Sequence, residues 1–360
     1  MTGSMWCVVA SGDDQYVVDF PTLGFLAADW QEQHCIIPDG FHKGRPFVQA
    51  DWQLWCTLNH YRVKPTALWR PDRPILGPAF YNRRSQVVAP QKTGKGPYAA
   101  GLTCNEAVGP AVFAGWARGG ETYTCSDWGC GCGWVYEYEP GEPMGMPWPT
   151  PLIQLVATSE DQVDNVYRPL QAMIKGGPLQ EQMKVGEEFI RIGDEGKIEK
   201  VTSSALARLG NPIIFAVHDE TGTYTKTNKL KSVAKTMRRG LAGMGGRSLE
   251  TTNAWDPSQD STAQNTFESL APDVFKFFRQ PPKKLKFEDK AQRAEILKFV
   301  YDGSVWVDLD SIEADAVELM EKDPAEAARF YGNKLVQGKG SWMPPELWES
   351  TEVAVEVEAV

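Results

Sequence analysis

The 360-residue sequence contains no apolar run long enough to cross a bilayer. Its first 13 residues also lack the basic stretch and apolar core of a secretory signal. These absences exclude a membrane-spanning protein and give no support for export. The seven cysteines are odd in number, which favours a reducing compartment over a disulfide framework. Four of them are scattered along the chain: Cys7, Cys35, Cys56 and Cys104.

An excess of basic residues is also lacking, because 37 lysines and arginines stand against 47 acidic residues and the formal net charge is −10. Proteins that coat nucleic acid are usually basic, so any contact with DNA has to be local. Residues 223–247 are the candidate, with four lysines, three arginines and no acidic residue. This basic segment could contact DNA phosphates or a neighbouring subunit. A solvated helix face is the alternative.

Short apolar strands alternate with helical patterns through the middle of the chain. Strands are predicted at residues 86–89, 152–158, 213–217 and 248–252, with a hairpin at 189–201. Helices are predicted at residues 49–61, 98–107, 161–174 and 229–239. This order predicts an α/β fold with a mostly parallel sheet that helices cover on both faces.

Composition divides the chain into four parts. Residues 1–80 are rich in Trp and Pro and are expected to pack on an α/β core at 81–265. Within that core, residues 116–148 form an insertion rich in Gly, Pro, Cys and Trp. Residues 266–348 are predicted to be a mainly helical lid or linker, and 349–360 form a glutamate-rich tail without basic residues.

The first predicted strand leads into a phosphate loop, residues 90–97, whose sequence is PQKTGKGP. Phosphate groups need close backbone N–H groups, a helix N-terminus and a mobile cation. Gly94 and Gly96 allow a close approach, and Lys95 stands where a P-loop lysine reaches the phosphates. The usual first glycine is absent, and Gly96 replaces the Ser or Thr that holds Mg²⁺. A flexible turn between strand and helix is the alternative.

The third predicted strand ends in two adjacent carboxylates, Asp219 and Glu220. In P-loop ATPases the first carboxylate of such a pair binds Mg²⁺, and the second activates the attacking water. The alternative is a solvated acidic turn. Because the carboxyl ends of parallel strands meet at one sheet edge, Asp219 is expected near the phosphate loop. The joint pattern therefore supports an ATPase site more strongly than either motif alone.

Small polar side chains end the fourth predicted strand, at Thr251, Thr252 and Asn253. On the same sheet edge they could sense the γ-phosphate and pass the change to a mobile element. A simple Thr/Asn turn is the alternative.

Together these segments resemble phage terminase large subunits, especially those of tailed phages that infect actinobacteria. The resemblance spans about residues 45–345. It is carried by VVAPQKTGKG at 87–96, TSEDQVDNVYRPL at 158–170, PIIFAVHDE at 212–220 and TTNAWDP at 251–257. Terminases have a deviant Walker A loop with Arg or Gln in place of the first glycine, and here that residue is Gln91. The resemblance implies a P-loop NTPase fold of the ASCE, RecA-like type.

The resemblance also implies roles for individual residues. Lys95 would contact the ATP phosphates together with the rest of the Walker A loop, which is Gln91, Lys92, Thr93, Gly94 and Gly96. Asp219, in the Walker B strand, would hold Mg²⁺, Glu220 would be the catalytic base, and Thr251, Thr252 and Asn253 would couple hydrolysis to motion. Arg208 is a candidate for the arginine that a neighbouring subunit supplies, with an ordinary surface arginine as the alternative. Gln53 could read adenine, or its segment could serve helix packing through Trp52 and Trp55.

The implied partners are double-stranded DNA, the portal of the procapsid, a small terminase subunit and other copies of this chain in a ring, expected to be a pentamer. The expected location is the host cytoplasm. Full-length terminases also carry a two-metal nuclease domain. No predicted sheet follows residue 348 to host it, so we expect this chain to lack nuclease activity. A helicase-like ATPase and a non-hydrolysing nucleotide-binding scaffold are the competing functions.

The insertion contains three clustered cysteines, Cys125, Cys130 and Cys132. Clustered cysteines in a reducing compartment point to Zn²⁺. Their C-x₄-C-x-C spacing is not that of a standard zinc knuckle, and no fourth ligand stands nearby in the sequence. The interpretations are therefore a zinc site and a Gly-rich hairpin with free thiols.

Overall fold

A computed structural model describes residues 6–9, 15–72, 79–201 and 211–338 of the chain. Arg208 and the acidic tail at 349–360 lie outside the described residues. The predictions made for them are therefore not addressed by the structure.

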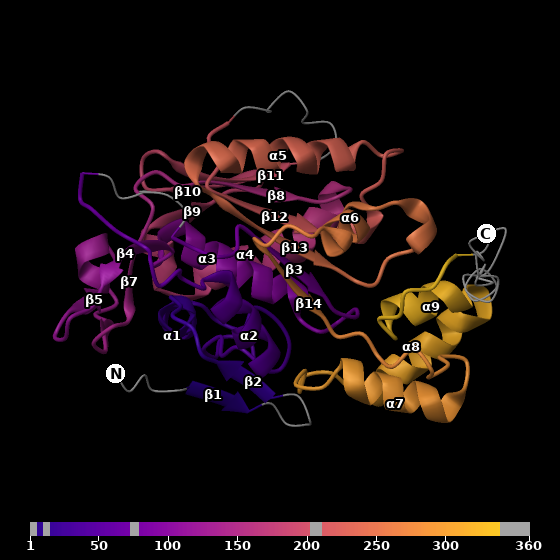
Figure 1. The fold of residues 1–360 in the computed structure, drawn as a ribbon. Coiled ribbons are helices and arrows are strands. Elements are labelled where there is room, and N and C mark those ends of the chain that lie inside the picture. Colours follow the sequence, from indigo (N-terminus) through magenta and orange to yellow (C-terminus); the bar gives the residue numbers. More distant parts are fainter. Residues whose placement is uncertain (1–5, 10–14, 73–78, 202–210, 339–360) are drawn as a thin grey trace, which may run out of the picture.

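An eight-stranded sheet runs through the centre of the molecule (Figure 1), in the order β14-β3-β13-β12-β8-β11-β10-β9. The first six strands are parallel, and β10 and β9 continue the sheet antiparallel. The strands are β3 (Arg84–Val88), β8 (Leu152–Val156), β9 (Met183–Val185), β10 (Phe189–Ile192), β11 (Gly196–Val201), β12 (Phe215–Asp219), β13 (Arg247–Thr252) and β14 (Val274–Phe278).

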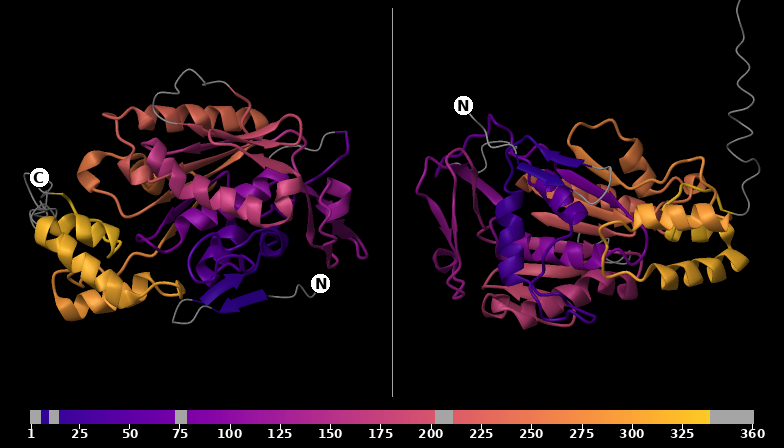
Figure 2. Two further views of the ribbon diagram at one scale, coloured as in Figure 1. Left: turned by 180° about the vertical axis from the view of Figure 1, so that it is seen from behind. Right: turned by 90° about the horizontal axis from the view of Figure 1, so that it is seen from below.

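The central parallel strands β3, β8, β12 and β13 are buried on both faces, as is usual in a parallel sheet. Helices α3 (Lys95–Val108) and α4 (Glu160–Gly176) cover one face, while α5 (Leu230–Met244) and α6 (Thr262–Glu268) lie on the other (Figures 1 and 2). The buried residues of α5 recur at helical spacing, namely Leu230, Val233, Ala234, Met237 and Leu241. The predicted mostly parallel α/β sheet with covered faces is therefore confirmed.

Strand order decides which loops meet. β13 lies between β3 and β12, and each of the three ends at the same edge of the sheet. The phosphate loop follows β3, while the acidic pair lies at the end of β12 and the Thr/Asn segment at the end of β13. The topology thus places the three predicted motifs side by side.

The N-terminal part packs beneath the sheet. It contains the ribbon β1 (Trp6–Val9) and β2 (Gln15–Val18), followed by α1 (Gly24–His34) and α2 (Asp51–His60). The two helices pack closely, because a Cβ at Gly24 would lie 2.5 Å from the Cα of Leu58. α1 also contacts α3, and α2 contacts β3 and β14. The two helices therefore pack against α3 and β3, the elements on either side of the phosphate loop.

A buried polar cluster joins α2, α3 and β13. Arg247 forms an ion pair of 2.5 Å with Glu106, and the Tyr61 hydroxyl donates to the same carboxylate over 2.8 Å. The Arg247 guanidinium also lies over the rings of Tyr61 and Phe80. A buried pair of this kind is costly to break from one side, by about 3–5 kcal/mol. Arg247, counted in the basic segment, is consequently a core residue rather than a DNA contact.

The C-terminal helices form a small subdomain with its own core at the side of the sheet (Figure 1). They are α7 (Lys290–Val300), α8 (Leu309–Lys322) and α9 (Pro324–Phe330). The prediction of a mainly helical segment at residues 266–348 missed β14, which pairs with β3 and extends the sheet. Its sequence, VFKFF, is too short and too apolar for its period to be read reliably.

The insertion consists of two small antiparallel hairpins. β4 (Val112–Trp116) pairs with β7 (Pro143–Met146), and between them β5 (Thr122–Thr124) pairs with β6 (Val135–Glu137). The short 3₁₀ helix η1 (Cys125–Trp128) follows β5. The hairpins project at one side of the molecule, beside α1 (Figure 1).

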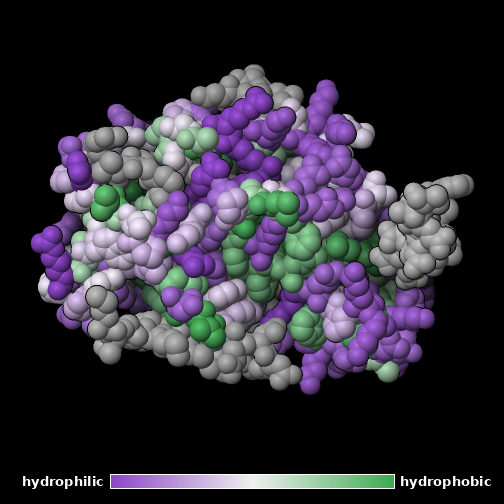
Figure 3. Space-filling model, in the orientation of Figure 1, coloured by the Kyte–Doolittle hydropathy of each residue, from purple (hydrophilic) through white to green (hydrophobic). Residues whose placement is uncertain are grey.

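Polar residues dominate the face shown in Figure 3, with smaller apolar areas among them. Of the helices in the described part of the chain, none combines the length and the apolar composition that crossing a membrane requires.

Candidate nucleotide-binding site

The phosphate loop joins β3 to α3 and is shaped by two left-handed residues. Gly94 precedes the helix at φ 85°, and Lys92 has φ 68°. The Thr93 hydroxyl donates to the carbonyl of Pro90 over 2.8 Å, which closes the turn. Because α3 begins at the end of this loop, its free N–H groups and its positive dipole end face the same place. The predicted strand, loop and helix are all present.

Lys95 is the first residue of α3, and its side chain is only 7% exposed. Its ammonium donates to the carbonyls of Ala89 and Pro90 and to Oδ1 of Asn253, each over 2.8 Å. An ammonium has three hydrogens, so all its donors are used. Burial lowers the pKa of Lys95, whereas the nearby carboxylates of Glu220 and Asp219 act to raise it. The amine thus lies near the predicted acidic pair, while its hydrogen bonds go to Ala89, Pro90 and Asn253.

Gly96 stands where the standard motif has a Ser or Thr, and the structure gives a reason. A Cβ at Gly96 would lie 2.3 Å from the backbone oxygen of Asn165 on α4. Helix α4 therefore packs against the loop so closely that no side chain fits at this position. The departure from the motif reflects this packing and removes a hydroxyl ligand from the site.

Asp219, the last residue of β12, is 5% exposed and accepts a hydrogen bond of 2.6 Å from the Thr251 hydroxyl. Burial raises the pKa of Asp219, against the effects of the hydrogen bond from Thr251, the Lys95 ammonium and the side chain of Asn165. The carboxylate is thus oriented by the neighbouring strand. Asn165 was not predicted as a site residue, although it lies in one of the segments that carry the resemblance.

Glu220 follows directly and adopts a left-handed backbone conformation, with φ 56°, which is uncommon for a residue with a side chain. Burial raises the pKa of the Glu220 carboxyl to about 7, helped by Asp219 and opposed by Lys95 and by the backbone N–H of Asn253. A carboxylate with a pKa near neutral pH suits a general base. The strained backbone is a further mark of a functional position.

Asn253 connects the two motifs. Its Oδ1 accepts from Lys95 over 2.8 Å, and its Nδ2 donates to Glu220 over 3.3 Å. Thr252, beside it, accepts a hydrogen bond from the N–H of Gly222 over 3.0 Å. The Thr/Asn segment is therefore in direct contact with both sides of the site, which the sequence indicated only through its place at a strand end.

Gln53 lies beside the loop, with its Nε2 3.5 Å from the place where a Cβ of Gly94 would stand. Its Oε1 accepts from the backbone N–H of Ala50 and so caps α2. The Trp306 indole, from the segment between α7 and α8, also lies against Gly94 and donates to the carbonyl of Lys92 over 3.3 Å. Trp306 was missed, because nothing in the sequence separates it from any other loop tryptophan.

The backbone of Gln91 donates to the carbonyl of Phe330, at the end of α9, over 2.9 Å. The loop therefore contacts the C-terminal subdomain through both Lys92 and Gln91.

The basic segment is partly neutralised within the fold. Arg238 pairs with Glu250 at 2.5 Å, and Lys231 pairs with Asp260 at 2.8 Å. Its exposed cations include Lys229, Lys235 and Arg239. Fewer cations of this segment are thus free on the surface than its four lysines and three arginines suggest.

The three predicted cysteine ligands, Cys125, Cys130 and Cys132, also come together, and a histidine from outside the insertion joins them. No fourth ligand stands near the cysteines in the sequence, and the structure supplies one from elsewhere, because His34 at the end of α1 lies against the sulfurs.

Mg²⁺ prefers oxygen ligands, and the site offers a buried carboxylate on Asp219 with the Thr251 hydroxyl beside it. Both come from adjacent parallel strands, and the Asp219 carboxylate is near Lys95. This donor set fits a hard divalent cation that keeps several waters. Gly96 contributes no side-chain ligand.

No family model matches the chain. The Gene 13 protein of Mycobacterium phage D29 is 23% identical over 394 residues, which covers 96% of this chain and 61% of that protein. Among solved structures, the HK97 bacteriophage large terminase superposes with a TM-score of 0.61 at 16% identity, covering 91% of this chain and 58% of that one. The chain thus spans about three fifths of each protein. The predicted P-loop NTPase fold and the resemblance to phage terminase large subunits are confirmed.

Proposed function

We propose that this chain is the ATP-hydrolysing motor subunit of a phage terminase, which translocates double-stranded DNA into the procapsid. The observation that carries the proposal is the convergence of Lys95, Asp219 and Glu220 at one sheet edge, linked by Asn253. A buried cation beside two carboxylates, at the N-terminus of a helix, matches the needs of a nucleoside triphosphate.

In this proposal Lys95 leaves its backbone carbonyl partners and donates to the β- and γ-phosphate oxygens. The N–H groups at the start of α3 hold the same phosphates. Asp219 and Thr251 would hold Mg²⁺, which when bound neutralises charge on the phosphate oxygens. Glu220 takes the proton of the attacking water, and its pKa of about 7 makes it an efficient base at neutral pH.

Asn253 gives the proposed site a coupling path. When Lys95 moves to the phosphates, Asn253 loses its acceptor contact and can reorient against Glu220. Thr251 and Thr252 lie on the same strand end, so the change reaches the neighbouring turn at Gly222. Asn253 would thus have two alternative sets of contacts, as coupling of ATP hydrolysis to motion requires.

The proposed partners are those that the resemblance implies: double-stranded DNA, the procapsid portal, a small terminase subunit and further copies of this chain in a ring, with the host cytoplasm as location. The exposed cations of the basic segment, Lys229, Lys235 and Arg239, would serve DNA or a neighbouring subunit. Arg208 remains the candidate for the arginine supplied in trans, and Gln53 for a contact to adenine.

The test is steady-state ATP hydrolysis by the full chain, with and without double-stranded DNA, for wild type, Lys95→Ala and Glu220→Ala. Lys276→Ala is the matched lysine control, because the Lys276 ammonium also donates to two backbone carbonyls but lies on β14. We expect both site variants to lose turnover by about 10²-fold or more, and the control to retain it. Equal activity in Glu220→Ala and wild type would refute the assignment.

One observation favours a second function, a non-hydrolysing nucleotide-binding scaffold. Gly96 lacks the Mg²⁺-binding hydroxyl, and the Asn165 carbonyl blocks its replacement. Wild type that binds ATP without turnover, even with DNA and portal-bearing procapsids, would support the scaffold. DNA-stimulated turnover that needs no procapsid would instead support a helicase-like ATPase.

A further inference from the structure

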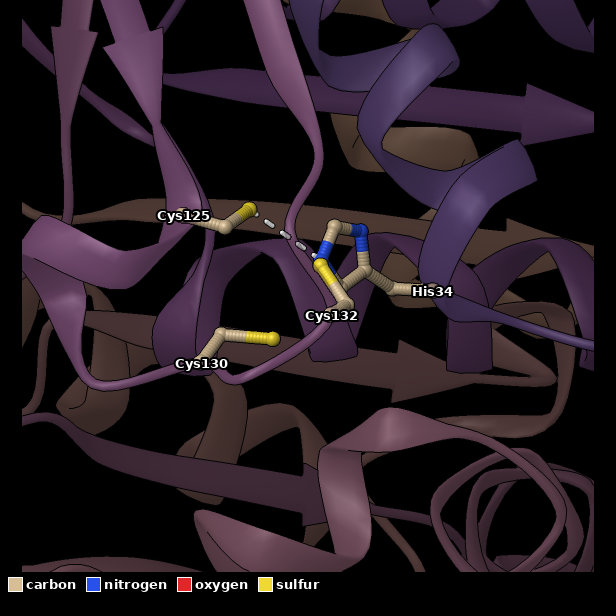
Figure 4. Close-up of side chains that lie close together, drawn as sticks. All are labelled: His34, Cys125, Cys130 and Cys132. Atoms are coloured by element: carbon tan, nitrogen blue, oxygen red, sulfur yellow. Dashed lines mark hydrogen bonds between the residues drawn. The ribbon is translucent and has the colours of Figure 1, made fainter.

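A second cluster of chemically reactive side chains lies far from the sheet edge, between α1 and the insertion. Its members are His34, Cys125, Cys130 and Cys132, and each offers one ligand atom. These four atoms all lie within 4.8 Å of one another. Figure 4 shows the three sulfurs and the imidazole pointing toward a common centre.

The distances fit a tetrahedral site. Nε2 of His34 is 3.2 Å from the sulfur of Cys125 and 3.2 Å from that of Cys132. With Zn–N bonds of about 2.0 Å and Zn–S bonds of about 2.3 Å, tetrahedral ligands stand about 3.6 Å (N to S) and about 3.8 Å (S to S) apart. A metal ion at the centre would therefore require shifts of only a few tenths of an ångström in the closest pairs.

The histidine has the tautomer that a metal ligand needs. Its Nδ1 lies 2.7 Å from the carbonyl of Trp30, which can only accept, so Nδ1 carries the hydrogen. Nε2 is therefore left with its lone pair facing the sulfurs. Metal-bound histidines are held in this way, by a carbonyl or carboxylate on the other ring nitrogen. The Trp30 ring stacks on the imidazole at 4.3 Å and fixes its plane.

Backbone donors face the sulfurs as they do in thiolate sites. The N–H of Trp134 donates to the sulfur of Cys132 over 3.4 Å, and the N–H of Cys132 donates to the sulfur of Cys130. Gly129 and Gly133, with φ of 81° and 75°, form the turns that bring the cysteines around. Two cysteines separated by one residue can bind the same metal ion only if the backbone turns sharply. The glycines permit this turn because glycine readily adopts positive φ.

The cluster is closed to solvent. His34, Cys125 and Cys130 are at most 3% exposed, and only Cys132 is partly accessible. Four protein ligands leave no open position for a substrate, which is the pattern of structural rather than catalytic zinc. The soft sulfur ligands favour Zn²⁺ over the oxygen-preferring Mg²⁺ of the nucleotide site.

We infer that His34, Cys125, Cys130 and Cys132 form a structural zinc site that joins the insertion to α1. The metal would tie together segments about 90 residues apart. Since α1 packs against α2 and α3, it would also hold the N-terminal helices and the insertion in one arrangement beneath the phosphate loop. The site is independent of the proposed ATPase function, because none of its ligands lies at the nucleotide-binding edge.

The test is the metal content of the full chain, expressed with zinc and purified without chelator, measured by inductively coupled plasma mass spectrometry. We expect about one zinc per chain. Replacing zinc by Co²⁺ should give the visible bands of a tetrahedral thiolate complex, with one nitrogen ligand. Cys132→Ser, chosen because Cys132 is the least buried ligand, should weaken zinc binding by more than about a hundredfold.

Cys104→Ala is the matched control, because Cys104 is a buried thiol on α3 outside the cluster. It should retain the metal and the cobalt spectrum. Wild type without zinc that cannot take up Co²⁺, or a disulfide among Cys125, Cys130 and Cys132 in the freshly purified reduced chain, would overturn the inference. If Cys132→Ser fails to fold, the zinc content and cobalt spectrum of the wild type still decide whether the four residues form a zinc site. Neither the zinc content nor the cobalt spectrum depends on ATP hydrolysis.

Discussion

The nucleotide-binding edge and the cysteine cluster are built by different means. At the sheet edge, each group lies at or just after the end of its own parallel strand, so the strand order brings Lys95, Asp219 and Asn253 together. In the cysteine cluster, three ligands come from one local turn and the fourth from a helix about 90 residues earlier. The first site forms only when the strands of the sheet pair in the observed order, whereas the second needs only a contact between α1 and the insertion.

The largest expected difference between the two regions is in the rate of ATP hydrolysis. Glu220→Gln keeps the size of the side chain and removes the proposed base, so turnover should fall by about 10²–10⁴-fold while ATP binding persists. Zinc content should be unchanged. The measurement is single-turnover ATP hydrolysis together with nucleotide binding. Glu199→Gln, a buried carboxylate on β11 away from this edge, is the control that should keep its turnover. Loss of ATP binding in Glu220→Gln would mean that Glu220 has a structural role instead.

The next effect is on stability and tests why the phosphate loop departs from the standard motif. Gly96→Ser would restore the missing hydroxyl, yet its Cβ would meet the Asn165 carbonyl at 2.3 Å. We expect it to lower the free energy of unfolding by about 1–3 kcal/mol, as overpacking does, and not to raise turnover. The measurement is chemical denaturation of the full chain, with ATP turnover alongside.

Gly243→Ser is the control, since a Cβ at that helical position on α5 meets nothing within 4 Å. It should be neutral or slightly stabilising, because serine has the better helix propensity. A Gly96→Ser variant as stable as wild type would show that α4 can move away from the loop.

The comparison also shows what the sequence can reveal. Strands that end in Lys-, Asp- or Asn-containing turns predict a shared edge, and the structure does bring Lys95, Asp219 and Asn253 together there. The connection through Asn253, the block at Gly96 and the approach of Trp306 depend on side-chain packing between distant elements. His34 was missed for the same reason, since no local spacing relates it to the cysteines. β14 was missed because a five-residue apolar run has no distinctive period.

A smaller effect concerns pH. Burial raises the pKa of Glu220 to about 7, above the ordinary value of 4.5 that it regains on unfolding. An acid with a raised pKa favours folding fully below pH 4.5, and that contribution is lost as the pH rises through 7. Glu220→Gln should therefore be more stable than wild type at pH 8, and the difference should shrink toward pH 5. Thermal unfolding at the two pH values measures this.

The control for this pH effect is Glu199→Gln, which should have the opposite sign at pH 8. The Glu199 carboxylate pairs with Lys197 at 2.7 Å and accepts from Gln154 over 2.8 Å, and glutamine at this position loses the ion pair. A Glu220→Gln variant less stable than wild type at pH 8 would show that Lys95 and the N–H of Asn253 outweigh burial.

The smallest expected effect is a change in tryptophan fluorescence, and each of the two regions contains its own tryptophan reporter. Trp306 lies against Gly94 and the Lys92 carbonyl, so phosphates in the loop should change its surroundings. Trp134 lies edge-on to His34 with ring centres 5.7 Å apart, so removal of a metal should change Trp134 instead. We expect Trp306→Phe to lose most of the fluorescence change caused by ATP and to keep that caused by a chelator, whereas Trp134→Phe should do the reverse. A chelator response that vanishes with Trp306 would mean that the two regions are coupled, because α1 and α3 would then transmit the state of the cysteine cluster to the loop.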